Sequence, residues 1–313
     1  MTHDPPSAER PLRIGTRGSP LALAQAREAR DRLMAAHGLP ETAFTIVPIR
    51  TAGDRIQDRP LGEIGGKGLF TREIEAALLE SLIDVAVHSM KDMPTLQPGG
   101  LAITCALPRE DPRDAFVSPA AASLAALPAG SVVGTSSLRR RAQLLHRRPD
   151  LAVVEFRGSV QTRLRKLAEG VAQATFLAMA GMHRLGLAEV ARGPIDPDEM
   201  LPAVAQGTIG IEQRLDDDRV AALLAPINDT ATGIRLAAER SFLAGLDGSC
   251  QTPIAGLAEL DGTTLRLRGE IIRPDGSESL SDDLEGAADQ AEAIGAELAA
   301  TLRGRAGEGF FAG

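Results

Sequence analysis

The chain has 313 residues, of which 43% are hydrophobic and 24% are charged, and its formal net charge at pH 7 is −8. This length predicts two or three domains, and the composition is ordinary for a globular protein. The negative net charge argues against general nucleic-acid binding, and the absence of Trp and Tyr leaves few aromatic faces for stacking bases. The chain has no apolar run of membrane-spanning length and no signal-peptide pattern at its start, so we expect a cytoplasmic protein.

Units in which a strand leads into a helix recur along the first two thirds of the chain. The first covers residues 11–38, where Ser19 is a suitable N-cap and Pro20 takes the first helical position. An apolar strand that ends in a polar turn is predicted at 81–94. Strands that alternate with helices indicate βαβ units and mostly parallel sheets. Further strand–helix units are predicted at 130–148, 151–170 and 174–187.

The last 85 residues differ from the rest of the chain. A helix is predicted over 229–246, followed by strands that Asp–Gly turns divide at 261–262 and 275–276. An Ala- and Glu-rich helix is predicted from about residue 286. This pattern is typical of a small α+β domain.

Two Pro- and acid-rich segments, 107–116 and 193–218, are predicted to cross between domains. With these crossings the sequence predicts an α/β protein with three domains. Domain 1 comprises 1–107 with 208–226, domain 2 comprises 112–202, and domain 3 comprises 229–313.

Positive charge is concentrated between Thr135 and Lys166, where nine basic residues are opposed only by Asp150 and Glu155. A local cationic field in an acidic protein favours a small anionic ligand. Helix N-termini beyond the carboxyl ends of strands favour anions as well. Three predicted strand–helix junctions carry suitable groups: Arg17 with Ser19; Thr135, Ser136 and Ser137 with Arg139 and Arg140; and Arg157 and Arg163 with Ser159.

One such junction is usually an ordinary helix cap beside a solvated charge. Three junctions of the same design favour convergent binding of an anion. Because Arg matches carboxylates bidentately, a ligand with several carboxylates is the natural expectation.

The loop over 62–73 is rich in Gly and carries Lys67 and Phe70. It lacks the spacing of a phosphate-binding loop. The segment is either a surface turn or a mobile loop that approaches a ligand.

In the segment 87–94, a strand brings Ser89, Lys91 and Asp92 into a turn. Asp92 either stabilises that turn or acts on a ligand, by handling protons or stabilising a cation. His88 alternates with apolar positions, so we expect it to pack within the strand.

The chain has only two cysteines, which fits a reducing compartment and excludes a disulfide framework. Cys105 lies in the strand-like stretch "LAITCAL" and is expected to be buried and inert. Cys250 lies in the small-residue loop "LDGSCQTPIAG", where apolar neighbours at a regular period are missing. The five histidines are scattered and no Cys-x-x-Cys occurs, so no metal site is expected.

Nine stretches together resemble one family, porphobilinogen deaminase, also called hydroxymethylbilane synthase. They occur in the family's order between about residue 12 and residue 256. The stretches are "GTRGSPLALAQ", "GGKGLF", "VHSMKDMP", "EDPRDAF", "GTSSLRR", "RGSVQTR", "LAMAGMHRLG", "LPAVAQGTIGIE" and "GSCQTPI".

The resemblance implies two periplasmic-binding-protein-like βαβ domains joined by two crossing segments, and a small α+β C-terminal domain that carries the cysteine. It implies a transferase of tetrapyrrole and heme biosynthesis. Such an enzyme joins four molecules of porphobilinogen head to tail, releases ammonia at each addition, and yields the linear tetrapyrrole 1-hydroxymethylbilane. The chain grows on a dipyrromethane cofactor, which the resemblance places on Cys250 through a thioether.

The resemblance also implies roles for individual residues. Asp92 corresponds to the catalytic carboxylate. The acetate- and propionate-binding arginines correspond to Arg17, Arg139, Arg140, Arg157, Arg163 and Arg184. Other pocket positions are Ser19, Lys67, Phe70, Ser89, Lys91, Thr135, Ser137 and Gly207. The sequence departs from the familiar family pattern at Glu63, Ser159, Ala205 and Ser249.

The expected partner is the small molecule porphobilinogen, with no nucleic acid and no membrane, and the protein is expected to be a monomer. The competing interpretation is a non-catalytic carboxylate-binding protein of the two-domain clamp type. Such a receptor normally carries an export signal, which we do not find, and has no need of a loop cysteine.

Overall fold

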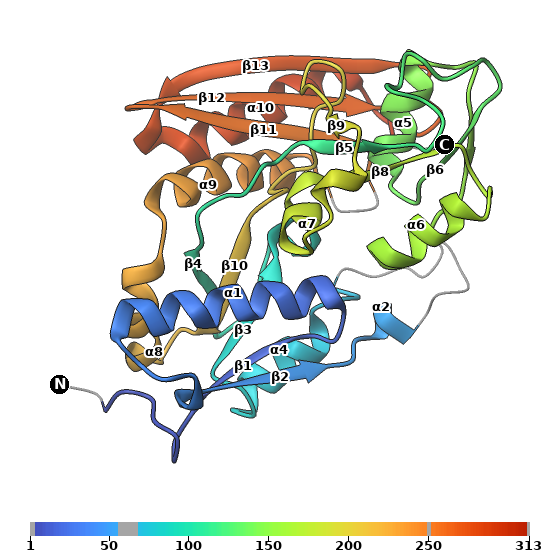
Figure 1. Cartoon of the computed structure of the whole chain (residues 1–313). Helices are drawn as coiled ribbons and strands as arrows, with labels where there is room; N and C mark the ends of the chain where they lie inside the picture. Colours follow the sequence, from blue (N-terminus) through green and yellow to red (C-terminus); the bar gives the residue numbers. More distant parts are fainter. Residues whose placement is uncertain (1–3, 56–67, 249–251, 312–313) are drawn as a thin grey trace. The chain divides into compact units, whose positions relative to one another are not determined.

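The computed structural model describes residues 4–55, 68–248 and 252–311, which belong to two compact units (Figure 1). Of the described residues, the first unit contains 4–55, 68–109 and 208–233, and the second contains 110–207, 234–248 and 252–311. The chain changes unit between residues 109 and 110 and again between 207 and 208, inside the two segments predicted as crossings.

The first unit contains a five-stranded sheet with the strand order β2-β1-β3-β10-β4. The strands are β1 (Leu12–Arg17), β2 (Phe44–Ile49), β3 (Val85–Ser89), β4 (Leu101–Ala106) and β10 (Ile209–Arg214). The helices are α1 (Pro20–His37), α2 (Ala52–Arg55), α4 (Arg72–Leu79) and α8 (Asp218–Leu224).

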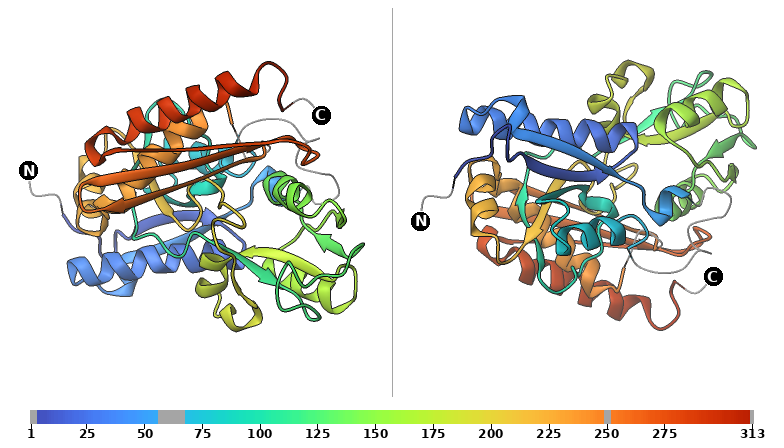
Figure 2. Two further views of the ribbon diagram at one scale, coloured as in Figure 1. Left: turned by 90° about the horizontal axis from the view of Figure 1, so that it is seen from above. Right: turned by 90° about the horizontal axis from the view of Figure 1, so that it is seen from below.

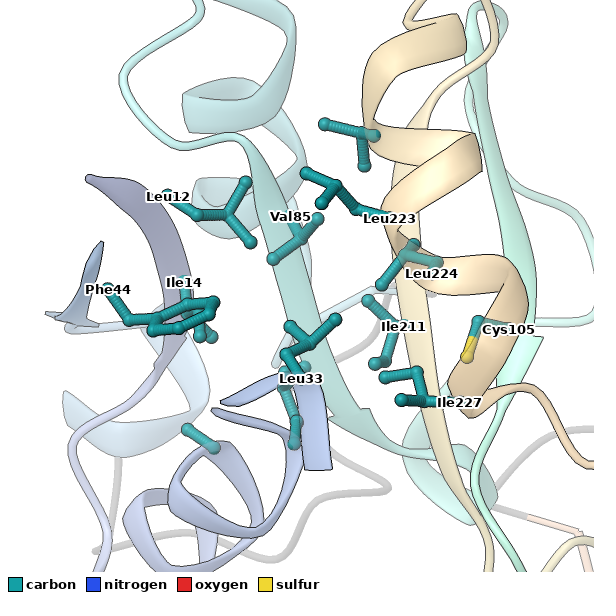
Figure 3. Close-up of a cluster of buried hydrophobic side chains, with 14 of the residues drawn as sticks. Leu12, Ile14, Leu33, Phe44, Val85, Cys105, Ile211, Leu223, Leu224 and Ile227 are labelled. Carbon is teal, nitrogen blue, oxygen red and sulfur yellow. The ribbon is translucent and has the colours of Figure 1, made fainter. Parts of the chain in front are cut away.

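Helix α1 begins as the sequence predicts, because the Ser19 side chain accepts a hydrogen bond from the backbone N–H of Ala22. It ends at Gly38, whose φ of 62° is a left-handed conformation that glycine adopts without strain. The helix buries Ala26, Ala29 and Leu33 against the sheet. Figure 3 shows this core, to which β1, β3, β10 and α8 also contribute. The apolar residues recur at helical spacing, so burial of one face fixes the helix on the sheet.

The second unit contains two sheets. One has five short strands in the order β7-β6-β8-β5-β9, and the other is an antiparallel sheet with the order β11-β12-β13. The strands of the first are β5 (Asp114–Val117), β6 (Val132–Gly134), β7 (Ala152–Val154), β8 (Ala174–Ala178) and β9 (Gly193–Pro194). Its helices are α5 (Leu138–Arg147), α6 (Val160–Ala168) and α7 (Met179–Arg184).

The three-stranded sheet consists of β11 (Ile254–Asp261), β12 (Thr264–Ile272) and β13 (Ser279–Ala287). Helix α10 (Ala291–Ala306) lies along it, together with the C-terminal part of α9 (Thr230–Gly245) (Figure 2). Close approach of α9 to α10 requires glycine, because a Cβ at Gly295 would lie 2.2 Å from the carbonyl oxygen of Ala238. The predicted helix start near residue 286 is wrong, because β13 continues to Ala287, opposite Thr264.

The Asp–Gly turns are confirmed, since Gly262 and Gly276 both have positive φ, at 56° and 79°. The predicted α/β class with a small α+β C-terminal part is also confirmed. The expectation of mostly parallel sheets is wrong, because β10 is antiparallel to β3 and β4, and β5 is antiparallel to β8 and β9. The chain leaves the first unit after β4 and returns to it in β10. Because it leaves and returns at the same end of the sheet, these two strands run in opposite directions.

Among the described helices, none has the length and apolar character that crossing a bilayer requires.

Candidate functional site

The first unit carries a pocket where β3 ends. A short turn of 3₁₀ helix, Met90–Asp92, follows β3 directly, and the backbone N–H of Met90 donates to the carbonyl of Thr208 at 3.0 Å. This bond ties the turn to the residue before β10 and so holds Asp92 at the end of the strand. The pocket is lined by Arg17, Ser19, Leu21, Ala22, Gln25, Phe70, Thr71, Val87, His88, Ser89, Asp92 and Met93.

The carboxylate of Asp92 is half-buried in this pocket. Within the described part of the chain it makes no hydrogen bond and no ion pair. A turn-stabilising aspartate would accept hydrogen bonds from neighbouring backbone N–H groups. The geometry therefore favours the second interpretation of Asp92, a carboxylate available to a ligand.

Arg17, at the end of β1, is held by two groups of its own unit. Its guanidinium pairs with Asp54 and lies over the ring of Phe70, with Cζ 4.2 Å from the ring centroid. The ring of Phe70 in turn requires the glycine at position 53, where a Cβ would lie 2.2 Å from it. Burial would raise the pKa of Asp54, but the bonds and charge of Arg17 outweigh burial and lower that pKa.

Sequence reasoning missed Gln25, which lines the same pocket. Its amide nitrogen donates to Ser89 Oγ at 2.8 Å, and Ser89 donates to the amide oxygen at 2.9 Å. Gln25 is 4% exposed on a helix face that otherwise buries alanines and leucine. A polar residue at an apolar position of a periodic helix was the signal that could have identified it.

In the second unit, helix α5 begins with Ser137, whose side chain accepts from the backbone N–H of Arg140 at 3.4 Å. Thr135 precedes it, and its hydroxyl accepts from the backbone N–H of Ser137 at 3.2 Å. The next two side chains of the predicted anion site do not face solvent. Arg139 and Arg140 are buried, with only 5% and 6% of their side chains exposed.

Both arginines pair with one carboxylate, that of Asp114, which is fully buried at the start of β5. Arg139 approaches one carboxylate oxygen at 2.8 Å, and Arg140 approaches the other at 2.7 Å. Gln206 also donates to Asp114, at 2.9 Å. Burial would raise the pKa of Asp114, but the charges of Arg139 and Arg140 hold that pKa well below its ordinary value. Asp114 was absent from the sequence prediction, and its position in the "EDPRDAF" stretch was the available signal.

Helix α6 provides the third predicted junction. Ser159 is its N-cap and accepts from the backbone N–H of Thr162, so the departure from the familiar family pattern retains a capping residue. Arg163 Nε donates to the carbonyl of Gly158 at 3.1 Å. Lys166 donates to the carbonyl of Arg157 at 3.0 Å. The junction is therefore present, with its basic groups near the start of the helix.

Arg184, at the end of α7, donates to the carbonyl of Gly207 at 3.2 and 3.3 Å. Gly207 has a φ of 89°, and a Cβ there would lie 2.3 Å from the carbonyl oxygen of Glu110. Only glycine fits this close approach, which explains the residue in structural terms.

Comparison with known proteins bears on what these groups do. Residues 12–222 match the family model "Porphobilinogen deaminase, dipyromethane cofactor binding domain", and residues 234–304 match "Porphobilinogen deaminase, C-terminal domain". The chain belongs to the porphobilinogen deaminase family.

Whole-chain relatives agree with this assignment to the porphobilinogen deaminases. The porphobilinogen deaminase of Paracoccus denitrificans (strain Pd 1222) is 68% identical over 306 residues, covering 98% of each chain. That of Nitrobacter hamburgensis is 58% identical over 298 residues, covering 95% of this chain and 94% of the relative. Among solved structures, the methionine-binding protein MetQ aligns with 71% of this chain and 91% of its own length, at 15% identity and a TM-score of 0.45.

Two of the residues that the family resemblance singles out, Lys67 and Cys250, lie outside the described residues, and so do Glu63 and Ser249. Cys105 is described and is buried in β4 as expected, with 1% of its surface exposed. Burial raises the pKa of its thiol to about 12, which leaves almost no thiolate at neutral pH.

Proposed function

We propose that this porphobilinogen deaminase joins four molecules of porphobilinogen stepwise, releasing ammonia at each addition, to give 1-hydroxymethylbilane. The observation that carries this proposal is the carboxylate of Asp92, unpaired within the described part of the chain, in a pocket that also presents Arg17, Ser19 and Ser89. Family membership disfavours the alternative of a non-catalytic binding protein.

The proposed role of Asp92 follows from the chemistry of the substrate. When the protonated aminomethyl group of porphobilinogen loses ammonia, it leaves an electron-poor azafulvenium cation. A nearby carboxylate stabilises that cation and accepts hydrogen bonds from pyrrole N–H groups. In this role a carboxylate without a protein partner is more effective than one already neutralised by an ion pair.

The carboxylates of the substrate and of the cofactor need cationic partners. We propose that Arg17, Arg139, Arg140, Arg157, Arg163 and Arg184 supply them. We also propose that the substrate or the cofactor is contacted by Ser19, Lys67, Phe70, Ser89, Lys91, Thr135, Ser137 and Gly207.

One observation supports the binding of an anionic cofactor by the second unit. Two buried arginines share the single carboxylate of Asp114, and Arg139 Nε has no hydrogen-bond partner among the described residues. The side chains of Arg139, Arg140 and Asp114 together carry one excess positive charge, and Arg139 Nε is an unused donor. Both features suit the binding of a carboxylate group. When bound, a dipyrromethane supplies the pyrrole carbon to which the first substrate is joined.

We further propose that the protein is cytoplasmic and monomeric, and that its three sheets belong to three domains.

We also propose that the cofactor is attached through a thioether to Cys250. A thiol suits the attachment, because a thiolate is a strong nucleophile and a thioether resists cellular reductants. Cys105 is the matched control, because it is buried in β4 and its thiol pKa is raised.

The test is intact mass spectrometry of the purified protein, combined with an assay of ammonia and linear tetrapyrrole released from porphobilinogen. We expect the active protein to exceed its sequence mass by one dipyrromethane, with the adduct on a peptide that contains Cys250 and stable to reductant. Cys250→Ala should lose adduct and activity, and Cys105→Ala should keep both. An active enzyme with the bare sequence mass, or an adduct on Cys105, would overturn the attachment; a wild-type protein that releases no ammonia would overturn the function.

A further inference from the structure

A buried pair of ionisable side chains lies next to the turn that carries Asp92. His88 of β3 and Glu212 of β10 are joined by a contact of 3.0 Å between Nε2 and one carboxylate oxygen, Oε2. Their side chains are 5% and 0% exposed. The two strands are neighbours in the sheet, with His88 opposite Gly210 and Glu212 opposite Ala86. Met90 packs against Gly210, where a Cβ would lie 2.1 Å from Met90 Sδ, so only glycine fits opposite His88.

The contact with Glu212 determines which imidazole nitrogen carries the hydrogen and which can accept a proton. An ionised carboxylate can only accept, so Nε2 carries the hydrogen and donates it. The neutral ring then has an unprotonated Nδ1, which is its proton acceptor. In the described part of the chain the ring makes no second hydrogen bond, and His88 lines the same pocket as Asp92.

Two carboxylates face this imidazole. Glu212 faces it from β10, and its second oxygen, Oε1, is buried without a hydrogen-bond partner among the described residues. Glu75 faces it from α4; burial and the charge of Glu212 raise the pKa of Glu75, while Thr71, His88 and Arg72 act in the opposite direction. A buried carboxylate with an unsatisfied oxygen is costly, and the hydrogen bond that Glu212 accepts from Nε2 offsets part of that cost.

In the proposed reaction, each addition removes one proton from the pyrrole that is extended. The aminomethyl group reacts in its protonated form, –CH2–NH3+, so that its C–N bond breaks and the electron pair leaves with nitrogen as NH3. A C–C bond then forms to the free α-carbon of the preceding pyrrole. The C–H bond at that carbon breaks, its electron pair returns to the ring, and the proton must be accepted by a base.

We propose that His88, oriented by Glu212, accepts this proton on Nδ1 and afterwards passes it to water. This inference rests on the proposed function. It divides the labour in the pocket: the carboxylate of Asp92 stabilises the cation that precedes C–C bond formation, and the imidazole accepts the proton that follows it. Glu212 is a positioning residue, because it acts through His88.

The test compares steady-state kinetics of His88→Gln and Glu212→Gln with the wild type across pH 5 to 9, using porphobilinogen and cofactor-loaded protein verified by intact mass. Gln at position 88 can still donate to Glu212 but cannot accept a proton. We expect kcat to fall about a hundredfold in His88→Gln with KM within about twofold, since a positioned acid–base group contributes ~10²–10⁴ in rate. The fall of wild-type kcat at acidic pH, where the imidazole is already protonated, should disappear in the variant. His37→Gln is the matched control, because the one hydrogen bond of the His37 ring among the described residues is with the backbone carbonyl of Leu223, elsewhere in the same unit.

A His88→Gln enzyme with kcat within threefold of wild type would overturn the inference. So would a low kcat whose pH profile keeps the wild-type shape, since that outcome indicates a structural role. If His88→Gln does not fold, Glu212→Gln decides: it should lower kcat and shift the acidic limb, and an unchanged limb would contradict the proposal. These outcomes are distinct from failure of the proposed function, in which wild-type protein itself would release no ammonia from porphobilinogen.

Discussion

Each unit contains an aspartate next to a strand and beside arginine-bearing elements, Asp92 just after β3 and Asp114 at the start of β5, yet the two carboxylates are used in opposite ways. Asp92 is half-buried in a pocket and has no partner within the described part of the chain. Asp114 is fully buried and pairs with Arg139, Arg140 and Gln206. The free energy of an ionised group depends on its partners, so the first carboxylate is suited to act on a ligand and the second to hold the protein's own cations in place.

The largest effect is expected where the paired carboxylate loses its charge. Asp114→Asn leaves two buried guanidinium groups without their counter-ion. Removing one partner of a buried ion pair typically costs ~3–5 kcal/mol. The free energy of unfolding, measured by denaturant titration, should fall by this amount. A loss below about 1 kcal/mol would show that solvent already compensates the arginines.

The same variant has a pH signature. The folded-state pKa of Asp114 lies below its ordinary value. Its stabilisation is therefore present above the unfolded pKa of about 3.9 and is lost as the pH falls toward the folded value. The difference in unfolding free energy between wild type and Asp114→Asn should narrow between pH 5 and pH 2. A difference that stays constant over this range would contradict the charge-based explanation.

The second effect concerns the unpaired carboxylate. Asp92→Asn should lower kcat by ~10²–10³, because loss of one positioned electrostatic group has this consequence. Unlike Asp114→Asn, it should leave the free energy of unfolding nearly unchanged, since no protein partner is lost. Asp92→Glu should keep weak activity. Turnover within tenfold of wild type in Asp92→Asn would contradict the catalytic assignment.

The sequence predicts what depends on neighbouring residues. Ser19, Ser137 and Ser159 cap their helices as expected, because a cap needs only the first turn of its own helix. The two Asp–Gly turns follow the same rule.

Pairings between distant segments could not be predicted in this way. His88 and Glu212 are 124 residues apart, and Asp114 precedes Arg140 by 26. Each pair meets only because two strands, or a strand and a helix, pack together. The pattern alone showed His88 as a strand residue and Arg140 as an anion binder at a strand–helix junction, whereas tertiary packing provides a buried partner for each.

A smaller effect is expected to separate the proposed ligand-binding arginine Arg163 from a surface charge on the same helix. Arg163→Leu should weaken substrate binding about ten- to a hundredfold, since a hydrogen bond to a charged group contributes roughly 1.5–3 kcal/mol. Arg165 is the matched control on α6. Its side chain is 67% exposed, and it forms a long ion pair, 3.7 Å between Nε and Oε1, with Glu169 one turn away. Arg165→Leu should change KM less than twofold. Equal effects of the two changes on KM, measured at constant ionic strength, would show that only bulk charge matters.

The smallest effect tests the backbone that supports the paired carboxylate. Ala205 precedes Gln206, a partner of Asp114, and has a φ of 62° although it is not glycine. Its N–H donates to Glu239 at 2.5 Å, which holds it in this left-handed conformation. That conformation costs an alanine about 1–2 kcal/mol, and glycine avoids the cost while losing ~0.4–1 kcal/mol through the greater freedom of the unfolded chain. Ala205→Gly should therefore raise the free energy of unfolding by about 0.5–1 kcal/mol and leave kcat unchanged.

Gly207→Ala is the opposing control. The new Cβ would lie 2.3 Å from the Glu110 carbonyl oxygen, so this variant should be less stable than the wild type. A lower denaturant midpoint for Ala205→Gly would mean that the packing of this buried methyl group outweighs the backbone strain.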